Sequence, residues 1–377
     1  MRDERWETAR RVLAVRLDNL GDVLVTSPAL RAIKQSLPTA EVTLLASPVG
    51  AQVGRLHPDL AGVIVAEVPW VDPWRRLPRD SARERRLTDT LREDAFDAAI
   101  IFTSFRQSPL PAAYLCYLAD IPLRLGATTD GAGSLLTTRH RPPEQLCHEV
   151  ERGLDLVAAV GLTGEDDRLV LAIPDAAHDA ARRWLAETEP TDGPLVAIHP
   201  GCTMPARTYP WEGYAAIADR LVADLGATII LTGDTGEREL LERVAARVAP
   251  ASRRATRVCA GTLPFPAFCA LIAAADLVVT NNTGPMHIAA AVGTPVVALF
   301  ALTNPPEQWG PWRVPHRLLY HDVACRLCYS RVCPYDQECL RLVTPEMVVE
   351  AAAALLSESR VAREAAPPDT GVVRRPG

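Results

Sequence analysis

The chain has 377 residues, of which 48% are hydrophobic and 5% aromatic, and its formal net charge is −6. The length predicts two domains, and the apolar content is sufficient for two buried cores. The acidic balance and the few aromatic residues argue against a nucleic-acid-binding surface. No apolar run reaches membrane-spanning length, and the charged first residues lack the apolar region of a signal peptide. We therefore expect a cytoplasmic protein, with peripheral contact to the inner membrane face as a further option.

Apolar runs alternate with helical periodicity along the first half of the chain. The predicted strands cover 12–15, 42–46, 62–67 and 97–102, and the predicted helices cover 27–37 and 149–161. Between residues 126 and 148, a stretch rich in Gly, Thr, Arg and Pro, this pattern fades. Strands that alternate with helices predict a parallel sheet with helices on both faces.

The same alternation restarts after a polar, proline-containing linker around residues 187–194. The predicted strands are 195–198, 227–232, 276–280 and 295–300, and the predicted helices are 211–226, 237–248, 263–274, 286–292 and 344–358. We therefore predict an α/β protein built from two doubly wound, Rossmann-like domains, residues 1–185 and 186–358, that face a cleft. Residues 359–377 lack apolar periodicity and are predicted to form a disordered tail.

The loop Arg16–Asp22 directly follows the first predicted strand and opens a helix. Ligands of doubly wound sheets bind beyond the carboxyl ends of the strands, so this loop faces the predicted cleft. Asp22 is a candidate general base, but a carboxylate at a helix start could equally cap that helix. Asp18 is the rival carboxylate, and Arg16 could steer either acid or bind phosphate. The loop has neither the G-x-G-x-x-G pattern of dinucleotide sites nor a Walker A sequence.

Three loops after strands of the second half carry groups suited to a nucleotide diphosphate. Glycines allow close backbone approach, threonine and arginine suit phosphate oxygens, and a carboxylate can accept from ribose hydroxyls. The third loop also precedes a helix N-terminus, whose N–H groups form an anion site. Each loop alone also fits ordinary turn chemistry, so their convergence carries the prediction. The residues predicted to bind the donor are Gly201, Thr203, Arg207, Gly233, Glu237, Asn282, Thr283, Gly284, Pro285, Met286 and His287.

Several of these segments resemble one known family, in the same order along the chain. Residues Val12–Leu30 are similar to the opening of glycosyltransferase family 9, the ADP-heptose:lipopolysaccharide heptosyltransferases. Three later segments resemble further motifs of that family: Ile198–Gly201, Leu231–Gly233 and Asn282–His287. Residues 104–106 and 325–339 also have counterparts there. The resemblance extends over residues 11–355.

This resemblance implies a GT-B fold and an inverting glycosyl transfer that needs no metal for its chemistry. It implies that Asp22 is the general base that takes the proton of the acceptor hydroxyl. It also implies that Thr283, Gly284 and His287 hold the diphosphate of the sugar nucleotide. ADP-heptose or a related nucleotide sugar is then the donor co-substrate.

Two donor-binding positions depart from the family pattern. Arg207 stands where a lysine is usual, and Asn282 stands where an aspartate is frequent. An arginine keeps the charge but presents a planar fork of donors, and an asparagine removes a negative charge. These departures leave the donor sugar open. On the acceptor side, Arg16, Asn19 and Arg106 are the predicted binding residues.

Four of the nine cysteines follow the pattern C-x2-C-x4-C-x5-C, at Cys325, Cys328, Cys333 and Cys339. Four such ligands could form a structural zinc site, although the spacing is not that of a standard zinc finger. Reduced structural thiols are one alternative, and two disulfides in an oxidising compartment are another. We expect no catalytic role for these cysteines.

Residues 75–92 contain seven arginines, which nearby acidic residues partly balance. The simpler interpretation is a solvated helix face. The alternative is a basic surface for a phosphorylated acceptor or an anionic membrane.

The sequence therefore predicts a transferase that moves a heptose-like sugar from ADP-heptose to a hydroxyl group of a glycan, lipid-linked or lipopolysaccharide-type acceptor. One alternative is a transferase of the same fold with another nucleotide sugar and a small-molecule acceptor. Others are a non-catalytic nucleotide-sugar-binding relative and a two-domain epimerase or phosphorylase. A candidate base at the cleft disfavours the purely binding protein, and no nucleic-acid partner is expected.

Overall fold

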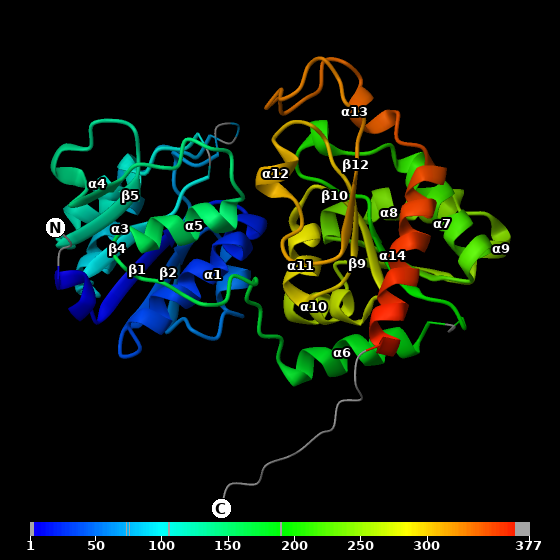
Figure 1. The fold of residues 1–377 in the computed structure, drawn as a ribbon, viewed down its shortest axis with the longest axis horizontal. Helices are drawn as coiled ribbons and strands as arrows, with labels where there is room; N and C mark the ends of the chain where they lie inside the picture. Colours follow the sequence, from blue (N-terminus) through cyan, green and yellow to red (C-terminus); the bar gives the residue numbers. More distant parts are fainter. Residues whose placement is uncertain (1–3, 73, 75, 105, 189–190, 366–377) are drawn as a thin grey trace, which may run out of the picture.

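The computed structural model describes residues 4–72, 74, 76–104, 106–188 and 191–365. Two α/β halves lie side by side, with the start of the chain in the blue half and its later part in the yellow and red half (Figure 1). In the described part of the chain, each half contains one six-stranded sheet with parallel strand pairs. The prediction of an α/β protein with two doubly wound halves is confirmed.

The first sheet has the strand order β3-β2-β1-β4-β5-β6. Its strands are β1 (Arg11–Arg16), β2 (Glu41–Ala46), β3 (Gly62–Val65), β4 (Ala98–Ile101), β5 (Leu123–Ala127) and β6 (Thr138–His140). The helices of this half are α1 (Leu20–Ser36), α2 (Gly50–Gly54), α3 (Ser81–Glu93), α4 (Leu110–Leu118) and α5 (Glu149–Ala158), with 3-10 helices η1 (Glu4–Thr8) and η2 (Gly133–Leu135). The central strand β1 is buried after its first residue, as expected for a parallel strand covered on both faces.

The second sheet has the strand order β12-β11-β10-β7-β8-β9. Its strands are β7 (Leu195–His199), β8 (Thr228–Gly233), β9 (Thr256–Ala260), β10 (Leu277–Asn281), β11 (Val296–Leu299) and β12 (His316–Leu319). The remaining helices are α6 (Asp175–Ala186), α7 (Trp211–Leu225), α8 (Arg238–Arg247), α9 (Pro250–Arg253), α10 (Phe265–Ala274), α11 (Gly284–Val292), α12 (Pro306–Trp309), α13 (Glu338–Arg341) and α14 (Pro345–Ala365), with 3-10 helices η3 (Pro205–Arg207) and η4 (Thr235–Glu237).

The strand order of each sheet reverses at its centre, between β1 and β4 in the first and between β7 and β10 in the second. Loops that leave neighbouring strands in opposite directions open a crevice at such a point, and ligands bind there. The loops after β1 and β10, which the sequence analysis singled out, therefore lie at the two crevices of the molecule.

Two helices are longer than predicted. Helix α1 begins at Leu20, so the loop residues up to Asp22 already form its first turn. Helix α14 continues to Ala365, so the predicted disordered tail is wrong for residues 359–365, whose Ala, Glu and Arg favour helix. Residues 366–377 lie outside the described residues. None of the described helices, α14 included, combines the length and apolarity needed to cross a bilayer.

Helix α6 packs on the second half, against α10. Its Ala177 and Ala181 are buried in a cluster with Ile230 of β8 and Leu271 of α10, and α6 runs below the second half in Figure 1. The predicted domain boundary at residue 185 placed this helix in the first domain. Packing instead associates it with the second sheet.

Several outer elements escaped prediction, among them β5, β6, β9 and β12. In β5 the apolar run is interrupted by Arg124, which is nevertheless buried because its guanidinium donates to the carbonyl oxygens of Leu135 and Ser134, each at 2.8 Å. Strand β12 lies at a sheet edge and is only partly buried. Neither strand therefore has the continuous apolar run of a central parallel strand.

The two halves are in direct contact through α1 and α11. Leu24 and Leu30 of α1 share one hydrophobic cluster with Met286 and Ile288 of α11. The N-terminal ends of these two helices carry Asp22 and His287. The fold therefore places the predicted base and the predicted diphosphate-binding segment at one junction between the halves.

Candidate functional site

Asp22 lies in the first turn of α1, and 8% of its surface is exposed. Its Oδ2 accepts a hydrogen bond from the Asn19 N–H at 2.9 Å, which caps the helix. Its Oδ1 lies at hydrogen-bond distance from the Arg16 guanidinium, 3.1 Å, and from the Ser104 hydroxyl, 3.0 Å. A carboxylate offers about four acceptor positions, so these contacts leave room for one further donor. The capping and base roles of Asp22 are therefore compatible.

Arg16 is the centre of a buried charge cluster at the end of β1, and only 2% of its surface is exposed. Its guanidinium lies 3.2 Å from Asp18 Oδ2, 3.1 Å from Asp22 Oδ1 and 3.9 Å from Glu149 Oε2. Although burial acts against the charge, these carboxylates raise the pKa of Arg16. The steering role predicted for Arg16 fits this geometry. The predicted acceptor contact does not fit it, because the guanidinium is enclosed by its carboxylate partners.

Asp18, the rival base, is committed to contacts within the first half. Its Oδ1 accepts a hydrogen bond from the side chain of Gln107 at 2.7 Å, and its Oδ2 pairs with Arg16. Burial raises the pKa of Asp18, and Arg16 opposes this effect. Asp22 instead acts to raise the pKa of both Arg207 and His287, against the effect of burial, so it lies near these two second-half side chains at the junction.

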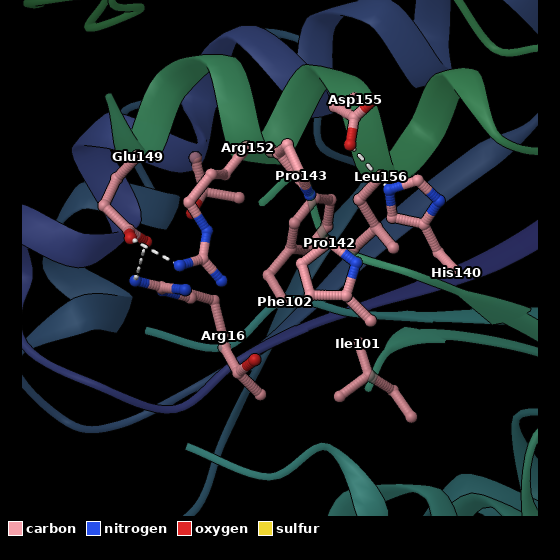
Figure 2. Close-up of a pocket in the computed structure, with 14 residues that line it drawn as sticks. Arg16, Ile101, Phe102, His140, Pro142, Pro143, Glu149, Arg152, Asp155 and Leu156 are labelled. Atoms are coloured by element: carbon pink, nitrogen blue, oxygen red, sulfur yellow. Dashed lines mark hydrogen bonds and ion pairs between the residues drawn. The ribbon is translucent and has the colours of Figure 1, made fainter. Parts of the chain in front are cut away.

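Figure 2 shows a cavity of about 20 Å³ beneath α5, at the carboxyl ends of the first-half strands. Arg16 lines it together with Glu149 and Arg152 of α5, and His140 pairs with Asp155 at 2.6 Å on another side. Such a volume holds about one water molecule. The cavity therefore belongs to the charge cluster and is too small for a sugar.

Three members of this cluster were missed by sequence reasoning: Ser104, Gln107 and Glu149. Ser104 and Gln107 follow β4 and contact Asp18. Glu149 begins a predicted helix, where an acid is expected for electrostatic reasons alone. The available signal was position, because Ser104 and Gln107 lie on the loop after a central strand.

In the second half, Asn281 at the end of β10 ties together the predicted donor-binding loops. Its Oδ1 accepts a hydrogen bond from the Tyr209 N–H at 3.0 Å, and its Nδ2 donates to the carbonyl oxygens of Pro200 at 2.9 Å and Gly201 at 3.2 Å. Gly201 in turn packs on Glu237, because a Cβ at this position would lie 1.8 Å from Glu237 Oε1. The loops after β7, β8 and β10 therefore lie next to one another, as predicted. Their binding of a donor stays a prediction.

Glu237 is partly engaged by the fold itself. Its Oε2 accepts a hydrogen bond from the Asp234 N–H at 2.9 Å and lies 3.7 Å from His199 Nε2. Burial raises the pKa of Glu237, and it lowers the pKa of His199 to about 4. Gly233 leaves space for this carboxylate, since its Cβ would lie 2.9 Å from Glu237 Oε2. The ribose contact of Glu237 stays a prediction.

Arg207 and Asn282, the two positions with unusual residues, are joined by one hydrogen-bond chain. Arg207 Nε donates to Thr303 Oγ1 at 2.9 Å, and Thr303 donates to Asn304 Oδ1 at 3.2 Å. Asn282 Nδ2 lies 3.3 Å from the same Asn304 oxygen, and Asn282 Oδ1 accepts from the Ala301 N–H at 3.2 Å. A carboxylate has no N–H to donate. Asparagine at position 282 therefore fits its neighbours, because its side chain is hydrogen-bonded to Asn304 and to the backbone of Ala301.

The N-terminus of α11 is the segment predicted to hold the diphosphate. Thr283 occupies the N-cap position without a side-chain capping hydrogen bond, Gly284 is the first residue of the helix, and Pro285 and Met286 are buried in the first turn. A hydrogen bond joins the Thr283 side chain to Cys202 on the loop after β7. Exposed N–H groups at such a helix end bind anions.

His287 also belongs to this predicted cradle. It is 6% exposed, and among the described residues its Nδ1 has no hydrogen-bond partner. Burial lowers the pKa of His287 to about 4, so the imidazole is neutral near pH 7. A buried ring nitrogen without a protein partner is suited to a ligand that supplies one.

Gly21 lies where the two halves approach each other closely beside Asp22. A Cβ on Gly21 would lie 2.7 Å from His287 Cδ2, and a Cβ on Gly284 would lie 3.3 Å from Leu20 Cδ2. Asp22 follows Gly21 directly, so the predicted base lies beside the predicted cradle. Glycine at position 21 is required by this contact.

We expect Gly21→Ala to destabilise the folded protein by about 1–3 kcal/mol, since the added methyl group must displace the imidazole or separate the halves. The free energy of unfolding in urea measures this effect. Gly131→Ala is the matched control, because a Cβ there has no neighbour within 4 Å. Equal stability of the two variants would contradict the close contact.

We expect the stability contributed by His287 to fall at acid pH. The folded-state pKa of about 4 lies below the unfolded value of 6.5, so between these values the unfolded chain alone takes up the proton. Stability is therefore complete above pH 6.5 and is lost as the pH falls towards 4. At pH 5 the loss is about 2 kcal/mol.

Urea denaturation of the wild type and of His287→Gln at pH 7 and pH 5 checks this expectation. Asp18 and Glu149, whose pKa values are raised by burial, give the opposite slope, but they titrate in both proteins and cancel in the comparison. The wild type should lose more stability than the variant. Parallel pH dependences would contradict a depressed His287 pKa.

Three predicted residues lie apart from the buried cluster. Asn19 and Thr203 are exposed, each on the loop that precedes a site segment. Arg106 is exposed as well, and its guanidinium lies 4.5 Å from the centre of the Tyr329 ring in the second half. It therefore connects the two halves through Tyr329, and its role in acceptor binding stays a prediction.

The four clustered cysteines are free thiols in partly exposed positions. Cys333 Sγ accepts backbone N–H groups of Tyr335 at 3.4 Å and Gln337 at 3.2 Å. Within the described ranges, no three Cys, His, Asp or Glu side chains are placed to hold a metal ion. The zinc interpretation of this segment gains no support from this arrangement, and reduced thiols agree with it.

The arginine-rich segment forms α3, and several of its arginines are paired locally. The ion pairs are Arg83–Glu84 at 2.6 Å, Arg86–Asp80 at 3.5 Å, Arg92–Asp89 at 2.8 Å and Arg92–Asp120 at 3.0 Å. Arg75 lies outside the described residues. These pairs agree with the solvated helix face, since charge that is already balanced attracts an anionic surface only weakly.

Comparisons with known proteins bear on the whole arrangement. Residues 84–338 match the model of glycosyltransferase family 9 (heptosyltransferase). Lipopolysaccharide heptosyltransferase 1 of Pseudomonas aeruginosa is 28% identical over 336 residues, which cover 86% of this chain and 88% of the relative. The structure of E. coli ADP-heptose LPS heptosyltransferase II has a TM-score of 0.75 at 21% identity and covers 93% of this chain and 99% of its own. E. coli heptosyltransferase WaaC with ADP-2-deoxy-2-fluoro heptose has a TM-score of 0.67 at 21% identity, with 91% and 99% covered.

Proposed function

The chain belongs to glycosyltransferase family 9, and we propose that it transfers a heptose from ADP-heptose to a hydroxyl group of a lipopolysaccharide-type acceptor. Its architecture is GT-B, with the two parallel sheets of the heptosyltransferases to which it is similar. Relatives that carry the name lipopolysaccharide heptosyltransferase, and a solved structure with an ADP-heptose analogue, support this donor and acceptor class. The observation that carries the proposal is the contact between the N-terminal turns of α1 and α11.

Asp22 is the proposed general base of the transfer. The acceptor hydroxyl attacks the anomeric carbon of the donor while its proton passes to the free acceptor position of the Asp22 carboxylate. Arg16 and the Asn19 N–H hold this carboxylate in place. A positioned base contributes about 10²–10⁴-fold to such a step. Attack from the face opposite the leaving ADP inverts the anomeric centre.

The leaving diphosphate is the proposed ligand of the second half. Negative charge develops on its β-phosphate as the glycosidic bond breaks, and fixed donors stabilise such charge. The first-turn N–H groups of α11, the Arg207 guanidinium and His287 are the groups proposed to supply this stabilisation. Arg207 is oriented by its Nε contact with Thr303, which leaves its other N–H groups for phosphate oxygens.

Several parts of the prediction remain proposals. We propose that no metal ion takes part in the transfer, and that the enzyme works at the cytoplasmic face of the inner membrane, where a lipid-linked acceptor is presented. Retained turnover in the presence of a chelator would agree with the first. Sedimentation with vesicles that carry the acceptor would agree with the second.

A different nucleotide sugar is the second candidate donor, because Arg207 and Asn282 depart from the family pattern at the proposed donor site. Replacement of a carboxylate by an amide at position 282 changes the charge beside the donor. The transferase chemistry of Asp22 would be the same with either donor.

The test is a transfer assay with ADP-heptose and a heptose-acceptor lipopolysaccharide core, followed by ADP release and by the mass of the product. A thermal-shift screen of ADP-, UDP-, GDP- and dTDP-sugars establishes the donor independently. We expect the largest shift with the ADP-sugar. A preference for another nucleotide would overturn the donor assignment, and sugar conversion without acceptor would indicate an epimerase.

A further inference from the structure

Glu149 is a buried carboxylate that no step of the proposed transfer uses. It is the first residue of α5, and only 5% of its surface is exposed. Its Oε2 lies 3.9 Å from the Arg16 guanidinium, and its Oε1 lies 3.4 Å from that of Arg152 (Figure 2). A buried charge is costly unless it is paired, so this placement is specific.

Glu149 also makes a contact with the opposite half. Gln308 of α12 donates its side-chain N–H to Glu149 Oε1 at 2.5 Å, and 1% of Gln308 is exposed. His148, next to Glu149, also contacts the chain just after α12. His148 Nε2 lies 3.0 Å from the Gly310 carbonyl oxygen, and its ring stacks on Trp312 at 4.5 Å. The two halves are thus joined beside Glu149 by polar and aromatic contacts.

A continuous polar path therefore runs from the donor half to the proposed base. It passes from Gln308 to Glu149, from Glu149 to Arg16, and from Arg16 to Asp22 at 3.1 Å. Arg16 is shared by three carboxylates, since Asp18 lies 3.2 Å away on another side. If one of these carboxylates is neutralised, the Arg16 guanidinium interacts more strongly with the remaining two.

We propose that Glu149 is a positioning residue for Asp22, which it acts on through Arg16, and that Gln308 makes this action depend on the seating of the donor half. This inference rests on the proposed function of Asp22 as the base. Glu149 shares the Arg16 guanidinium with Asp22. The ion pair between Arg16 and Asp22 is therefore weaker than it would be without Glu149. When the donor half moves away, Glu149 loses Gln308, its ion pairs with Arg16 and Arg152 rearrange, and Asp22 is no longer held in the transfer geometry.

The test compares Glu149→Gln with Glu151→Gln in the transfer assay. Both changes neutralise an acid in the first turn of α5, but Glu151 is exposed and only caps the helix through the His148 N–H. For Glu149→Gln we expect kcat to fall about ten- to hundredfold, as for a misplaced catalytic group, while the KM for the donor and the Kd for ADP stay within about twofold. Glu151→Gln should leave kcat unchanged.

Gln308→Met tests the second part of the path, because methionine fills a similar volume without an N–H donor. Its kcat should fall in the same direction with unchanged ADP affinity, and combining it with Glu149→Gln should cost no more than Glu149→Gln alone. Additive losses would overturn the coupling between the halves. A normal kcat for Glu149→Gln, or an equal loss in Glu151→Gln, would overturn the positioning role.

Crystal structures separate this inference from the proposed function. A wild-type protein without transfer activity would overturn the proposed function, and this inference with it. A Glu149→Gln structure in which Arg16 keeps its wild-type contacts with Asp22 would overturn the inference alone. We expect the Arg16 guanidinium in that variant to move towards Asp18 and Asp22.

Discussion

Asp22→Asn should reduce heptose transfer by about 10²–10⁴-fold, which is the contribution of a positioned base. An amide cannot accept the proton of the acceptor hydroxyl. It can still present an oxygen to Arg16, which keeps the first turn of α1 in place. ADP affinity, measured by calorimetry, should therefore match that of the wild type. Turnover of this variant at the wild-type rate would falsify the base assignment.

Asp18→Asn is the matched control for this experiment. Asp18 pairs with the same guanidinium, at 3.2 Å, but its other oxygen is bound by Gln107. We expect a smaller loss of turnover, because Asp18 supports the cluster without facing the second half. The opposite ranking of the two variants would make Asp18 the base.

Arg207→Ala should weaken ADP binding about ten- to hundredfold, which corresponds to the 1.5–3 kcal/mol of a charged hydrogen bond. Burial lowers the pKa of Arg207, and the nearby Cys202 and Asp22 oppose this effect. Its removal deletes a cation that the proposal places beside the diphosphate. Isothermal calorimetry with ADP measures the effect directly.

Two control variants test whether the effect of Arg207 comes from a specific contact with ADP. Arg207→Lys keeps the charge but loses the Nε donor to Thr303, so we expect an intermediate affinity. Arg106→Ala removes an exposed cation from the first half and should leave ADP affinity unchanged. If Arg106→Ala weakened ADP as much as Arg207→Ala, general electrostatic attraction would explain both, and Arg207 would have no specific contact.

The central strands were predictable because both faces of each are covered. Strands β1 and β10 are buried over nearly their whole length, so their apolar runs are continuous in the sequence. The outer strands lack such a continuous apolar run. In β5, Arg124 is buried by hydrogen bonds to carbonyl oxygens, which a hydropathy pattern reads as an exposed position. Such compensation is visible only once the chain is folded.

The site was predictable to the extent that its residues follow strands. Asp22 and the 282–287 segment were predicted to belong to the site because ligands bind where the carboxyl ends of central strands meet at a crevice. Glu149 was not found, since its partner Gln308 lies 159 residues away in the sequence. No local pattern distinguishes an acid that caps its helix from an acid that pairs across two halves.

The unusual residues at 207 and 282 show a further limit of sequence reasoning. Read singly, each substitution seemed to alter the donor site. In the fold, Thr303 and Asn304 join them in one chain of hydrogen bonds, so both side chains are held by protein groups. Contacts of this kind between distant residues cannot be recognised from one sequence alone.

The packing of α6 has a practical consequence for anyone who dissects this enzyme. A fragment of the donor-binding half that starts at residue 186 would leave Ile230 and Leu271 bare to water, because α6 supplies their covering alanines. Starting upstream of Asp175 retains this cover. Expression boundaries drawn from the linker alone would thus yield an aggregation-prone piece, although the missing helix carries no part of the site.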